Sequence, residues 1–264
     1  MPTPRSHDKY WRSQKVIVTA AGTGIGAEIA RTYFDLGAKV FICDIDETRL
    51  SSVTGDRPDL GAAVCDVSRP RDVDSFVDLA VETMGGLTIL VNNAGIAGPA
   101  KPLEDVTDDE WTQTFSINVA GQFYCARRAV PHLKANGGGS IVCMSSVAGK
   151  FGFALRSPYA ASKWAVIGFM RSLSVELGQA NIRVNAILPG IVSGQRNREV
   201  FAARAEARGI SYEQMSDLAL ASVSLKTMID PAEIADLIVY ITSPSGRAIT
   251  GQPLAICGGT EWIE

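Results

Sequence analysis

The chain has 264 residues, of which 46% are hydrophobic and 20% charged, and its formal net charge is −3. This hydrophobic content allows a substantial buried core and excludes an intrinsically disordered chain, while the length suits a single α/β domain. The small negative charge gives no electrostatic reason to expect nucleic acid as a partner.

The N-terminal segment up to Lys15 is polar and carries no apolar core of a secretory signal. No apolar run approaches the roughly 20 residues that a membrane-spanning helix needs. The five cysteines show neither CxxC pairing nor metal-ligand spacing, and several lie within apolar runs, where a buried reduced thiol is the ordinary state. These features predict a cytoplasmic protein with no bound metal and no membrane partner.

Short β-branched runs alternate with longer amphipathic segments. Strands are predicted over residues 15–19, 38–43, 62–65, 88–91, 140–144, 182–188 and 253–256. Helices are predicted over 27–36, 71–84, 108–135 and 159–178. Continuous apolar strands separated by helices are typical of a parallel sheet covered on both faces. Right-handed crossovers then give a doubly wound, Rossmann-type α/β fold of about seven strands.

We predict a single domain over residues 1–264, with a polar N-terminal extension over 1–14. The most irregular stretch follows Pro189 and has helical pattern at 199–208 and 212–220, but no strand of its own. An excursion beside the carboxyl edge of a doubly wound sheet is well placed to cover a substrate. The sequence therefore predicts a substrate lid over about 191–225.

A glycine-rich segment follows the first predicted strand and runs directly into a helix. Glycines allow a tight turn, and a helix N-terminus offers free N–H groups to a pyrophosphate. This position between strand and helix is the context that a dinucleotide-binding loop requires. The segment predicts cofactor contacts from Thr19, Gly22, Thr23, Gly24, Ile25 and Gly26.

Asp44 ends the second predicted strand. A carboxylate there accepts hydrogen bonds from the adenosine ribose hydroxyls and repels a 2′-phosphate. Thr23 in the glycine-rich loop brings no positive charge, and Arg49 is expected on the following helix. Asp44 therefore favours NAD over NADP; a simple turn or N-cap role for Asp44 is the alternative.

Tyr159 and Lys163 lie four residues apart, on one face of a predicted helix. An ammonium group held close to a phenol favours the phenolate and lowers the pKa of the tyrosine. This is what a general base needs in order to deprotonate an alcohol, or a general acid for the reverse reaction. A bare Tyr–Lys pair also occurs on many helices by chance, so the prediction depends on its partners.

Further motifs stand in order along the chain: Cys65-Asp-Val, Asn92-Asn-Ala-Gly, Asn118-Val-Ala-Gly, Ser145-Ser, Pro189-Gly and Thr250-Gly-Gln. With the glycine-rich loop and the Tyr159–Lys163 pair, this series resembles the classical short-chain dehydrogenase/reductase family from Lys15 to about Gly259. The resemblance implies an NAD-dependent oxidoreductase that acts on CH–OH groups.

Residue by residue, the resemblance implies that Tyr159 is the catalytic acid/base and that Lys163 holds the nicotinamide ribose. Ser146 would position the substrate oxygen, with Ser145 the lesser candidate, and Asn118 would support a proton relay. The cofactor contacts that the resemblance implies are Tyr159, Lys163, Asp66, Val67, Asn93, Ala94, Gly95, Pro189, Gly190 and Val192.

The sequence departs from the family pattern in three places. Ala20 replaces the usual first glycine of the loop, which is tolerable if its φ stays below zero. Gly194 replaces a threonine after Pro189-Gly190, so the carboxamide contact is expected from Ser193 or from backbone alone. Cys257 replaces an aspartate, without consequence for the predicted chemistry.

Arginines near the expected substrate mouth predict a polar, possibly anionic, alcohol or ketone substrate, because guanidinium groups bind carboxylate or phosphate. The candidates are Arg156, Arg196 and Arg198, with Ser146 at the reacting oxygen. The alternative is that these arginines face solvent or pair with acids. Phe151 and Phe153 could instead line an apolar pocket or belong to the core.

The resemblance also implies a homotetramer, or a homodimer, in which the helices predicted at 108–135 and 159–178 pair across a two-fold axis. Two further functions stay open. One is a 3-oxoacyl-thioester or steroid-type ketone reductase, of which the 3-oxoacyl-thioester reductase would prefer NADPH and need a basic residue for the 2′-phosphate. A non-catalytic NAD-binding sensor or scaffold is disfavoured, because a scaffold has no need of an activated phenol.

Overall fold

A single parallel sheet of seven strands organises the protein, in a computed structural model that describes residues 8–55 and 57–260. The strand order is β3-β2-β1-β4-β5-β6-β7, and every neighbouring pair is parallel. The strands are β1 (Lys15–Val18), β2 (Lys39–Asp44), β3 (Gly61–Val64), β4 (Ile89–Asn92), β5 (Gly139–Met144), β6 (Ile182–Pro189) and β7 (Pro253–Ile256). The predicted doubly wound α/β fold is confirmed.

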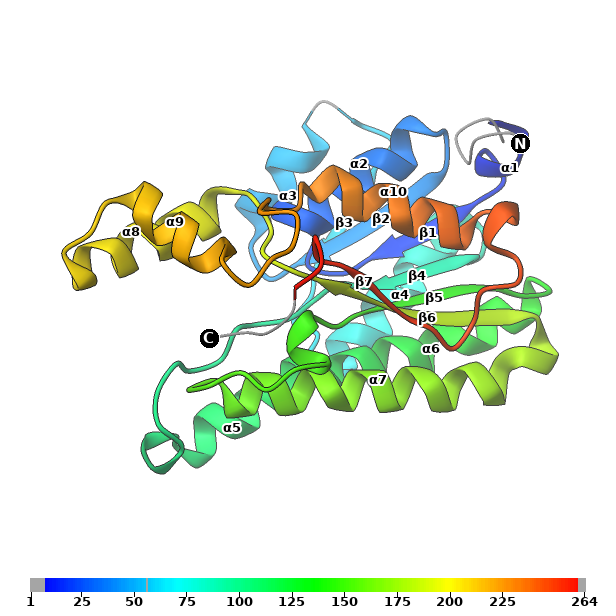
Figure 1. Cartoon of the computed structure of the whole chain (residues 1–264). Helices are drawn as coiled ribbons and strands as arrows, with labels where there is room; N and C mark the ends of the chain where they lie inside the picture. The colour runs from blue at the N-terminus through cyan, green and yellow to red at the C-terminus, as the bar shows by residue number, and fades with distance from the viewer. Residues whose placement is uncertain (1–7, 56, 261–264) are drawn as a thin grey trace.

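Helices cover both faces of the sheet (Figure 1). On one face lie α2 (Gly24–Asp35), α3 (Glu47–Thr54) and α10 (Pro231–Thr242), packed on an apolar core that includes Ile29, Leu50 and Ile238. On the other face lie α4 (Pro70–Met84), α6 (Gly121–Ala135) and α7 (Ser157–Leu177), over a second core that includes Phe76, Leu133 and Met170. The five inner strands β1, β2, β4, β5 and β6 therefore contribute side chains to both cores, which explains their continuous apolar runs.

The segment 108–135 is helical throughout, as predicted, but it is not one regular α-helix. The structure has α5 (Asp108–Phe115), a π-helical turn over Ser116–Ala120 and then α6. The side chain of Asn118 on this turn bonds the chain that follows β4. A tertiary contact thus widens the helix locally, and hydrophobic periodicity carries no sign of it.

The helix α10 is absent from the predicted elements, although its start carries a clear signal. Asp230 accepts from Ala232 N, Pro231 occupies the first turn, and Glu233 completes a capping box. The apolar run of α10 comes soon after the irregular stretch that follows Pro189, and the hydrophobic pattern did not separate the two.

Two helices extend from the body at the segment predicted as a lid. They are α8 (Gln195–Arg208) and α9 (Tyr212–Leu220), and Figure 1 shows them projecting away from the sheet. Their own small core is formed by Phe201, Ala205 and Met215. Both predicted helical stretches are therefore helical, and few contacts join this arm to the main cores.

The predicted polar extension over 1–14 falls partly outside the described residues, which begin at Asp8. Its last part is packed: α1 (Asp8–Trp11) ends in Trp11, which is fully buried with its ring 5.7 Å from that of Tyr33. Tyr10 donates to the carbonyl of Thr242 at 2.7 Å. The described end of the extension therefore packs against α2 and the last residue of α10.

Four of the five cysteines, Cys43, Cys65, Cys125 and Cys143, are buried free thiols, and Cys257 is partly exposed and free. Within the described ranges, no helix has both the length and the apolarity to cross a membrane. The same residues contain no group of three or more side chains arranged to hold a metal ion.

Candidate active site

The glycine-rich loop between β1 and α2 forms a cradle at the N-terminus of α2. Gly24 has a φ of +57°, and the space that a Cβ atom would enter is open. The N-cap residue Thr23 makes no side-chain capping bond, and the first turn carries no acidic residue. Free N–H groups and an open approach fit the pyrophosphate of a dinucleotide, as predicted for this loop.

Ala20 does not meet the condition under which an alanine was expected to be tolerable in the loop. Its φ is +49°, in the left-handed region, rather than below zero. The left-handed region costs a non-glycine residue about 1 kcal/mol, because Cβ crowds the following carbonyl. The strain persists because Asn93 Nδ2 holds the carbonyls of Thr19 and Ala20 at 3.0 Å each.

Thr19 and Asn93, both predicted cofactor residues, join β1 to β4 beneath the loop. The Thr19 hydroxyl accepts from the backbone N–H groups of Asn93 and Ala94, each at 3.0 Å. Gly26 lies so close to Ala20 O and Asn93 Nδ2 that a Cβ atom would be 2.5 Å from both. These residues hold the floor of the cradle; Ile25 is partly exposed beside it.

Asp44 is buried at the end of β2 and faces the glycine-rich loop. Its Oδ2 accepts from Gly22 N at 3.1 Å, and its Oδ1 accepts from Asp46 N at 3.2 Å. Arg49 lies on α3, as expected, and a Cβ atom on Gly22 would meet the Cβ of Arg49 at 2.6 Å. The carboxylate is thus fixed at the place where a ribose would meet the loop.

Asp66 and Val67 follow β3, next to Asp44. Asp66 Oδ1 accepts from Ser68 N at 2.9 Å, and its Oδ2 lies 3.3 Å from Arg69 Nε. Val67 is buried against Gly121 of α6. The Asp66 side chain therefore orders the turn after β3, and Val67 packs between this turn and α6.

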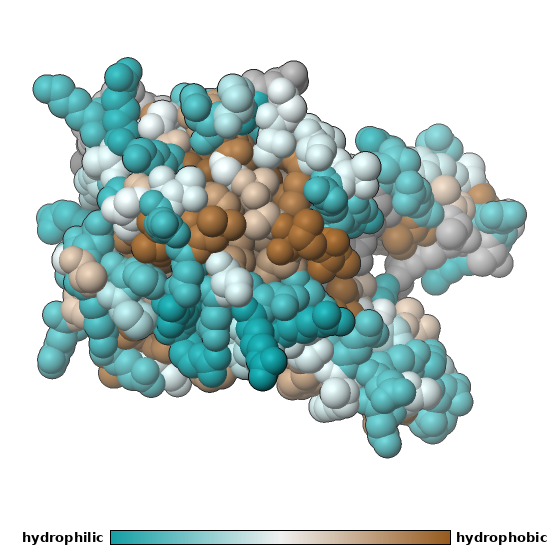
Figure 2. Space-filling model, turned by 180° about the vertical axis from the view of Figure 1, so that it is seen from behind, coloured by the Kyte–Doolittle hydropathy of each residue, from teal (hydrophilic) through white to brown (hydrophobic). Residues whose placement is uncertain are grey.

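Two apolar residues at this edge were not predicted as site residues. Ile45, directly after Asp44, is 68% exposed, and Val64, paired in register with Asp44, is 55% exposed. Figure 2 shows that an apolar area surrounded by hydrophilic side chains occupies the middle of the side opposite to the view of Figure 1. Exposed apolar residues beside Asp44 suit contact with a flat heterocycle such as adenine. The sequence feature that could have indicated Ile45 is its position directly after Asp44, the aspartate that ends a strand.

The segment after β6 meets the end of β7. Gly190 N donates to Ile256 O at 3.0 Å, and a Cβ on Gly190 would be 2.8 Å from Cys257 Cα. Val192 forms a parallel bridge with Ile229. Pro189 ends β6, so the predicted residues Pro189, Gly190 and Val192 lie at the carboxyl edge of the sheet, beside the start of the α8–α9 arm.

Tyr159 and Lys163 share one face of α7, which begins with Ser157 and Pro158. Lys163 is buried, and its Nζ donates to Met144 O at 3.0 Å. The same Nζ lies 5.6 Å from the centroid of the Tyr159 ring. Burial lowers the pKa of Lys163 to about 8, against an opposing effect of the Cys143 thiol. The predicted pair is therefore brought together with a desolvated amine beside a phenol.

Asn118 is fully buried on the π-helical turn and bonds both the loop after β4 and α7. Its Oδ1 accepts from Ile96 N at 2.7 Å, and its Nδ2 donates to Ile96 O and to Ser162 Oγ, each at 3.0 Å. Ser162 in turn donates to Tyr159 O at 2.7 Å. A Cβ on Gly95 would be 3.2 Å from both Asn118 Oδ1 and Lys163 Nζ. Gly95, Asn118 and Lys163 therefore meet at one point.

The two serines after β5 have different partners. Ser145 is buried and donates to Lys163 O at 2.8 Å, which ties β5 to α7. Ser146 is partly exposed and accepts from Ala148 N at 3.2 Å, so its hydroxyl proton has no acceptor among these bonds. This difference supports Ser146 as the serine that faces substrate, as predicted.

The arginines predicted to bind substrate are placed differently from one another. Arg156 Nη1 donates to Ala97 O at 3.2 Å and to Gly98 O at 3.3 Å, and its guanidinium lies over the Phe153 ring. Arg198 is exposed on α8, with Nη2 3.4 Å from Gln195 Oε1. The side chain of Arg196 lies outside the described part of the chain. A substrate role for each stays a prediction.

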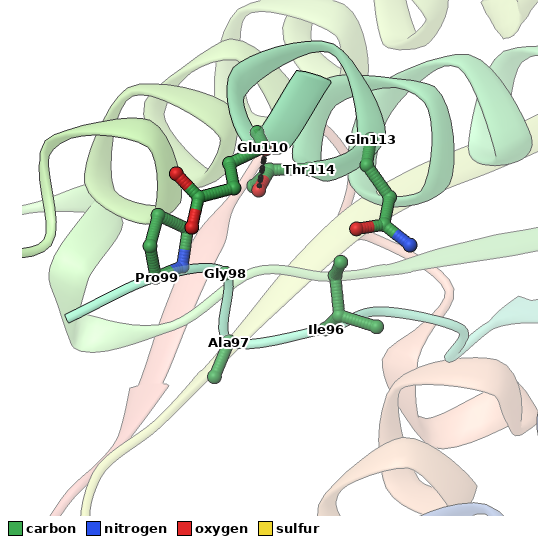
Figure 3. Close-up of a pocket in the computed structure, with 7 residues that line it drawn as sticks. All are labelled: Ile96, Ala97, Gly98, Pro99, Glu110, Gln113 and Thr114. Atoms are coloured by element: carbon green, nitrogen blue, oxygen red, sulfur yellow. Dashed lines mark hydrogen bonds between the residues drawn. The ribbon is translucent and has the colours of Figure 1, made fainter. Parts of the chain in front are cut away.

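A pocket of about 420 Å³ lies between α5 and the loop that follows β4. Figure 3 shows Glu110, Gln113 and Thr114 projecting from α5 toward Ile96–Pro99. Ile96 is the residue that Asn118 holds by both backbone groups, so one wall of the pocket adjoins the catalytic cluster. Sequence reasoning missed these polar residues, because nothing local indicates that α5 faces a cavity.

Comparison with known proteins gives a consistent result. Residues 19–261 match a family model described as enoyl-(acyl carrier protein) reductase. A putative ketoacyl reductase of Streptomyces coelicolor is 32% identical over 94% of this chain and 97% of its own length. The L-fucose dehydrogenase of Bos taurus is 33% identical over 93% of this chain and 88% of its own length.

Solved structures agree with these relatives. An actinorhodin polyketide ketoreductase with NADPH is 32% identical, with a TM-score of 0.89 over 95% of this chain and 98% of that chain. A 7α-hydroxysteroid dehydrogenase, complexed with NADH and an oxo bile acid, is 30% identical, with a TM-score of 0.84 over 94% of both chains.

The chain belongs to the short-chain dehydrogenase/reductase family, and the resemblance read from the motifs is confirmed. It is an oxidoreductase of the class that acts on CH–OH groups and binds a nicotinamide cofactor.

Proposed function

We propose that the protein is a cytoplasmic NAD(H)-dependent dehydrogenase that interconverts a secondary alcohol and a ketone on a small polar substrate. The observation that carries the proposal is the buried ammonium of Lys163, four residues after Tyr159 and 3.0 Å from Met144 O. A cation at this place favours the phenolate of Tyr159.

Each member of the cluster has a distinct task in the proposed reaction. The bound nicotinamide supplies the site that accepts or donates hydride. The Tyr159 hydroxyl takes the proton from the alcohol, or returns it to the ketone, and Ser146 orients the same oxygen. Lys163 stabilises the phenolate, and Asn118 holds Ile96 and Ser162 so that both stay in place.

The preference for NAD over NADP is proposed from Asp44. Its carboxylate is fixed by Gly22 N and Asp46 N, and it leaves a negative charge where a 2′-phosphate would lie. Like charges at this separation repel, and few water molecules screen a buried carboxylate.

A polar substrate is proposed from the pocket beside Ile96. Glu110 forms an ion pair with Lys101, in which Oε2 lies 2.8 Å from Nζ. Gln113 is exposed, and Figure 3 shows its carboxamide directed toward the pocket. Arg156 holds the loop that forms the opposite wall. These groups can hydrogen-bond hydroxyls of a polyol or hydroxy acid. The arm of α8 and α9 is proposed as the lid over this substrate.

A second candidate is a ketone reductase for a 3-oxoacyl or steroid-type substrate. It is favoured by the ketoacyl reductase and hydroxysteroid dehydrogenase among the relatives of similar length. A substrate of this kind would contact the apolar residues near the site, such as Phe151 and Phe153.

The test is a panel of polyols, sugar acids, hydroxy acids, 3-oxoacyl thioesters and steroids, followed by NADH absorbance with wild type and Tyr159→Phe. We expect turnover of a polar alcohol with NAD, and a loss of at least about a thousandfold in Tyr159→Phe, with NADH affinity nearly unchanged. Retained turnover in Tyr159→Phe would refute the mechanism. Turnover of only apolar ketones would favour the second candidate.

A further inference from the structure

Arg49 and Asp46, close to Asp44, form an ion pair that the proposed hydride transfer does not use. Arg49 on α3 has its Cβ against Gly22 of the glycine-rich loop, and Asp44 Oδ2 bonds the amide of the same glycine. A carboxylate and an arginine therefore flank one residue of the cofactor cradle. Between them they carry the charges that distinguish a ribose hydroxyl from a ribose phosphate.

Arg49 makes no ion pair with Asp44 among the described residues. Its Nε lies 3.2 Å from Asp46 Oδ2 instead. The Arg49 side chain is 53% exposed, so its guanidinium has room to take another orientation. Asp46 thus pairs with the arginine whose Cβ lies against Gly22 of the cofactor cradle.

Asp46 is itself well positioned for this contact. It is the N-cap of α3, where Oδ1 accepts from Thr48 N at 2.9 Å and from Arg49 N at 3.3 Å. These bonds hold Oδ1, and Oδ2 is left to meet Arg49. Asp46 N donates to Asp44 Oδ1 at 3.2 Å, so the capping residue is linked directly to the carboxylate at the proposed ribose site.

We propose that Asp46 is a specificity-determining residue for the cofactor, which disfavours NADP by holding the Arg49 guanidinium in an ion pair. The inference rests on the proposed NAD-dependent function. Asp46 acts through Arg49 and is a positioning residue, whereas Asp44 meets the cofactor.

The physical basis is a competition for one guanidinium. A 2′-phosphate and the Asp46 carboxylate are both anions, and Arg49 cannot serve both in the same orientation. With Asp46 present, NADP must break an existing ion pair as well as approach Asp44. Because the pair is exposed and screened by solvent, its contribution is modest, and a change of a few fold in cofactor preference is expected.

The test compares kcat/KM for NADP with kcat/KM for NAD in Asp46→Asn, Arg49→Gln and the double variant. Asparagine is as good an N-cap as aspartate, so α3 is retained while the ion pair is lost. We expect Asp46→Asn to raise the NADP/NAD ratio about three- to tenfold, and added salt to reduce this gain. The gain should disappear in the double variant, since it depends on Arg49.

The double variant separates the proposal from a simple charge effect. If Asp46→Asn raises the ratio equally with and without Arg49, removal of negative charge is the cause, and the ion-pair inference is overturned. An unchanged ratio in the single variant also overturns it. Asp78→Asn breaks an exposed ion pair with Arg128 on α6 and serves as the control, with no expected change in the ratio.

A binding measurement distinguishes failure of the Asp46 inference from failure of the proposed function. Binding of NADH and NADPH to each variant is followed by nicotinamide fluorescence, without any substrate. If neither cofactor binds wild type, the proposed function fails. If NADH binds and Asp44→Ala shifts the preference toward NADPH while Asp46→Asn does not, the proposed function stands and the Asp46 inference fails.

Discussion

Lys163 combines a proposed catalytic role with an unfavourable environment for a charge. Burial lowers its pKa from 10.5 to about 8, so the folded protein binds its proton less tightly than the unfolded chain does. Below pH 8 both states carry the proton, and burying the ammonium costs about 3 kcal/mol at about 1.4 kcal/mol per pKa unit. This cost decreases as the pH rises from 8 to 10.5, because the folded lysine then loses its proton first.

Lys163→Met should therefore be more stable than wild type at neutral pH. Because Met144 O loses its donor, we expect a net gain of about 1–2 kcal/mol in the free energy of unfolding at pH 7, which fades between pH 8 and 10.5. The kcat should fall at least about a hundredfold. Urea denaturation at several pH values measures the first, and NADH absorbance the second. Lys134→Met, on the exposed last turn of α6, is the control; a destabilised Lys163→Met would contradict this account.

The π-helical turn between α5 and α6 shows how an element is adapted to its site. One extra residue in the turn directs Asn118 inward, where it satisfies both backbone groups of Ile96 and the Ser162 hydroxyl. A regular α-helix over 108–135 would rotate this side chain away from the loop. The turn therefore couples the wall of the pocket to the helix that carries Tyr159.

Asn118→Ala should destabilise the protein by about 1–3 kcal/mol, because the partly buried N–H and C=O of Ile96 and the buried Ser162 hydroxyl all lose a partner. It should also lower kcat, since the Gly95 and Ser162 contacts of the cluster are no longer held. Asn118→Asp keeps the acceptor for Ile96 N but not the donor, and we expect an intermediate loss. Urea denaturation and kcat are measured together; equal stability of all three proteins would refute the role assigned to this turn.

At the scale of the whole molecule, α6 and α7 both carry exposed apolar side chains. Phe123 on α6 is 43% exposed, and Trp164 and Val175 on α7 are 53% and 82% exposed. Phe123 meets Phe169 of α7, and Arg127 lies over its ring. Aromatic and arginine side chains are enriched in protein interfaces. We propose that the surface of α6 and α7 joins the copies of a homotetramer, or of a homodimer.

Trp164→Glu should shift the protein toward smaller species, because a carboxylate would be buried without a partner at the proposed interface. Sedimentation velocity across a range of concentrations measures this shift. Leu218→Glu changes a residue of similar exposure on α9, outside the proposed surface, and should leave the assembly unchanged. A monomeric wild type, or an unchanged Trp164→Glu assembly, would contradict the proposal.

The amino-acid sequence by itself determined the alternation of strands and helices, the glycine-rich cradle, Asp44 at the end of β2 and the four-residue spacing of Tyr159 and Lys163. These features are local: periodicity, capping and short motifs are written in neighbouring residues. Only the tertiary structure decided the positive φ of Ala20, the π turn at Asn118, the commitment of Arg156 to Ala97 and Gly98, and the pairing of Arg49 with Asp46. The first two features depend on contacts between segments that are far apart in the sequence. The last two depend on which of several possible partners each arginine side chain contacts. Spacing along the chain does not reveal which partner prevails.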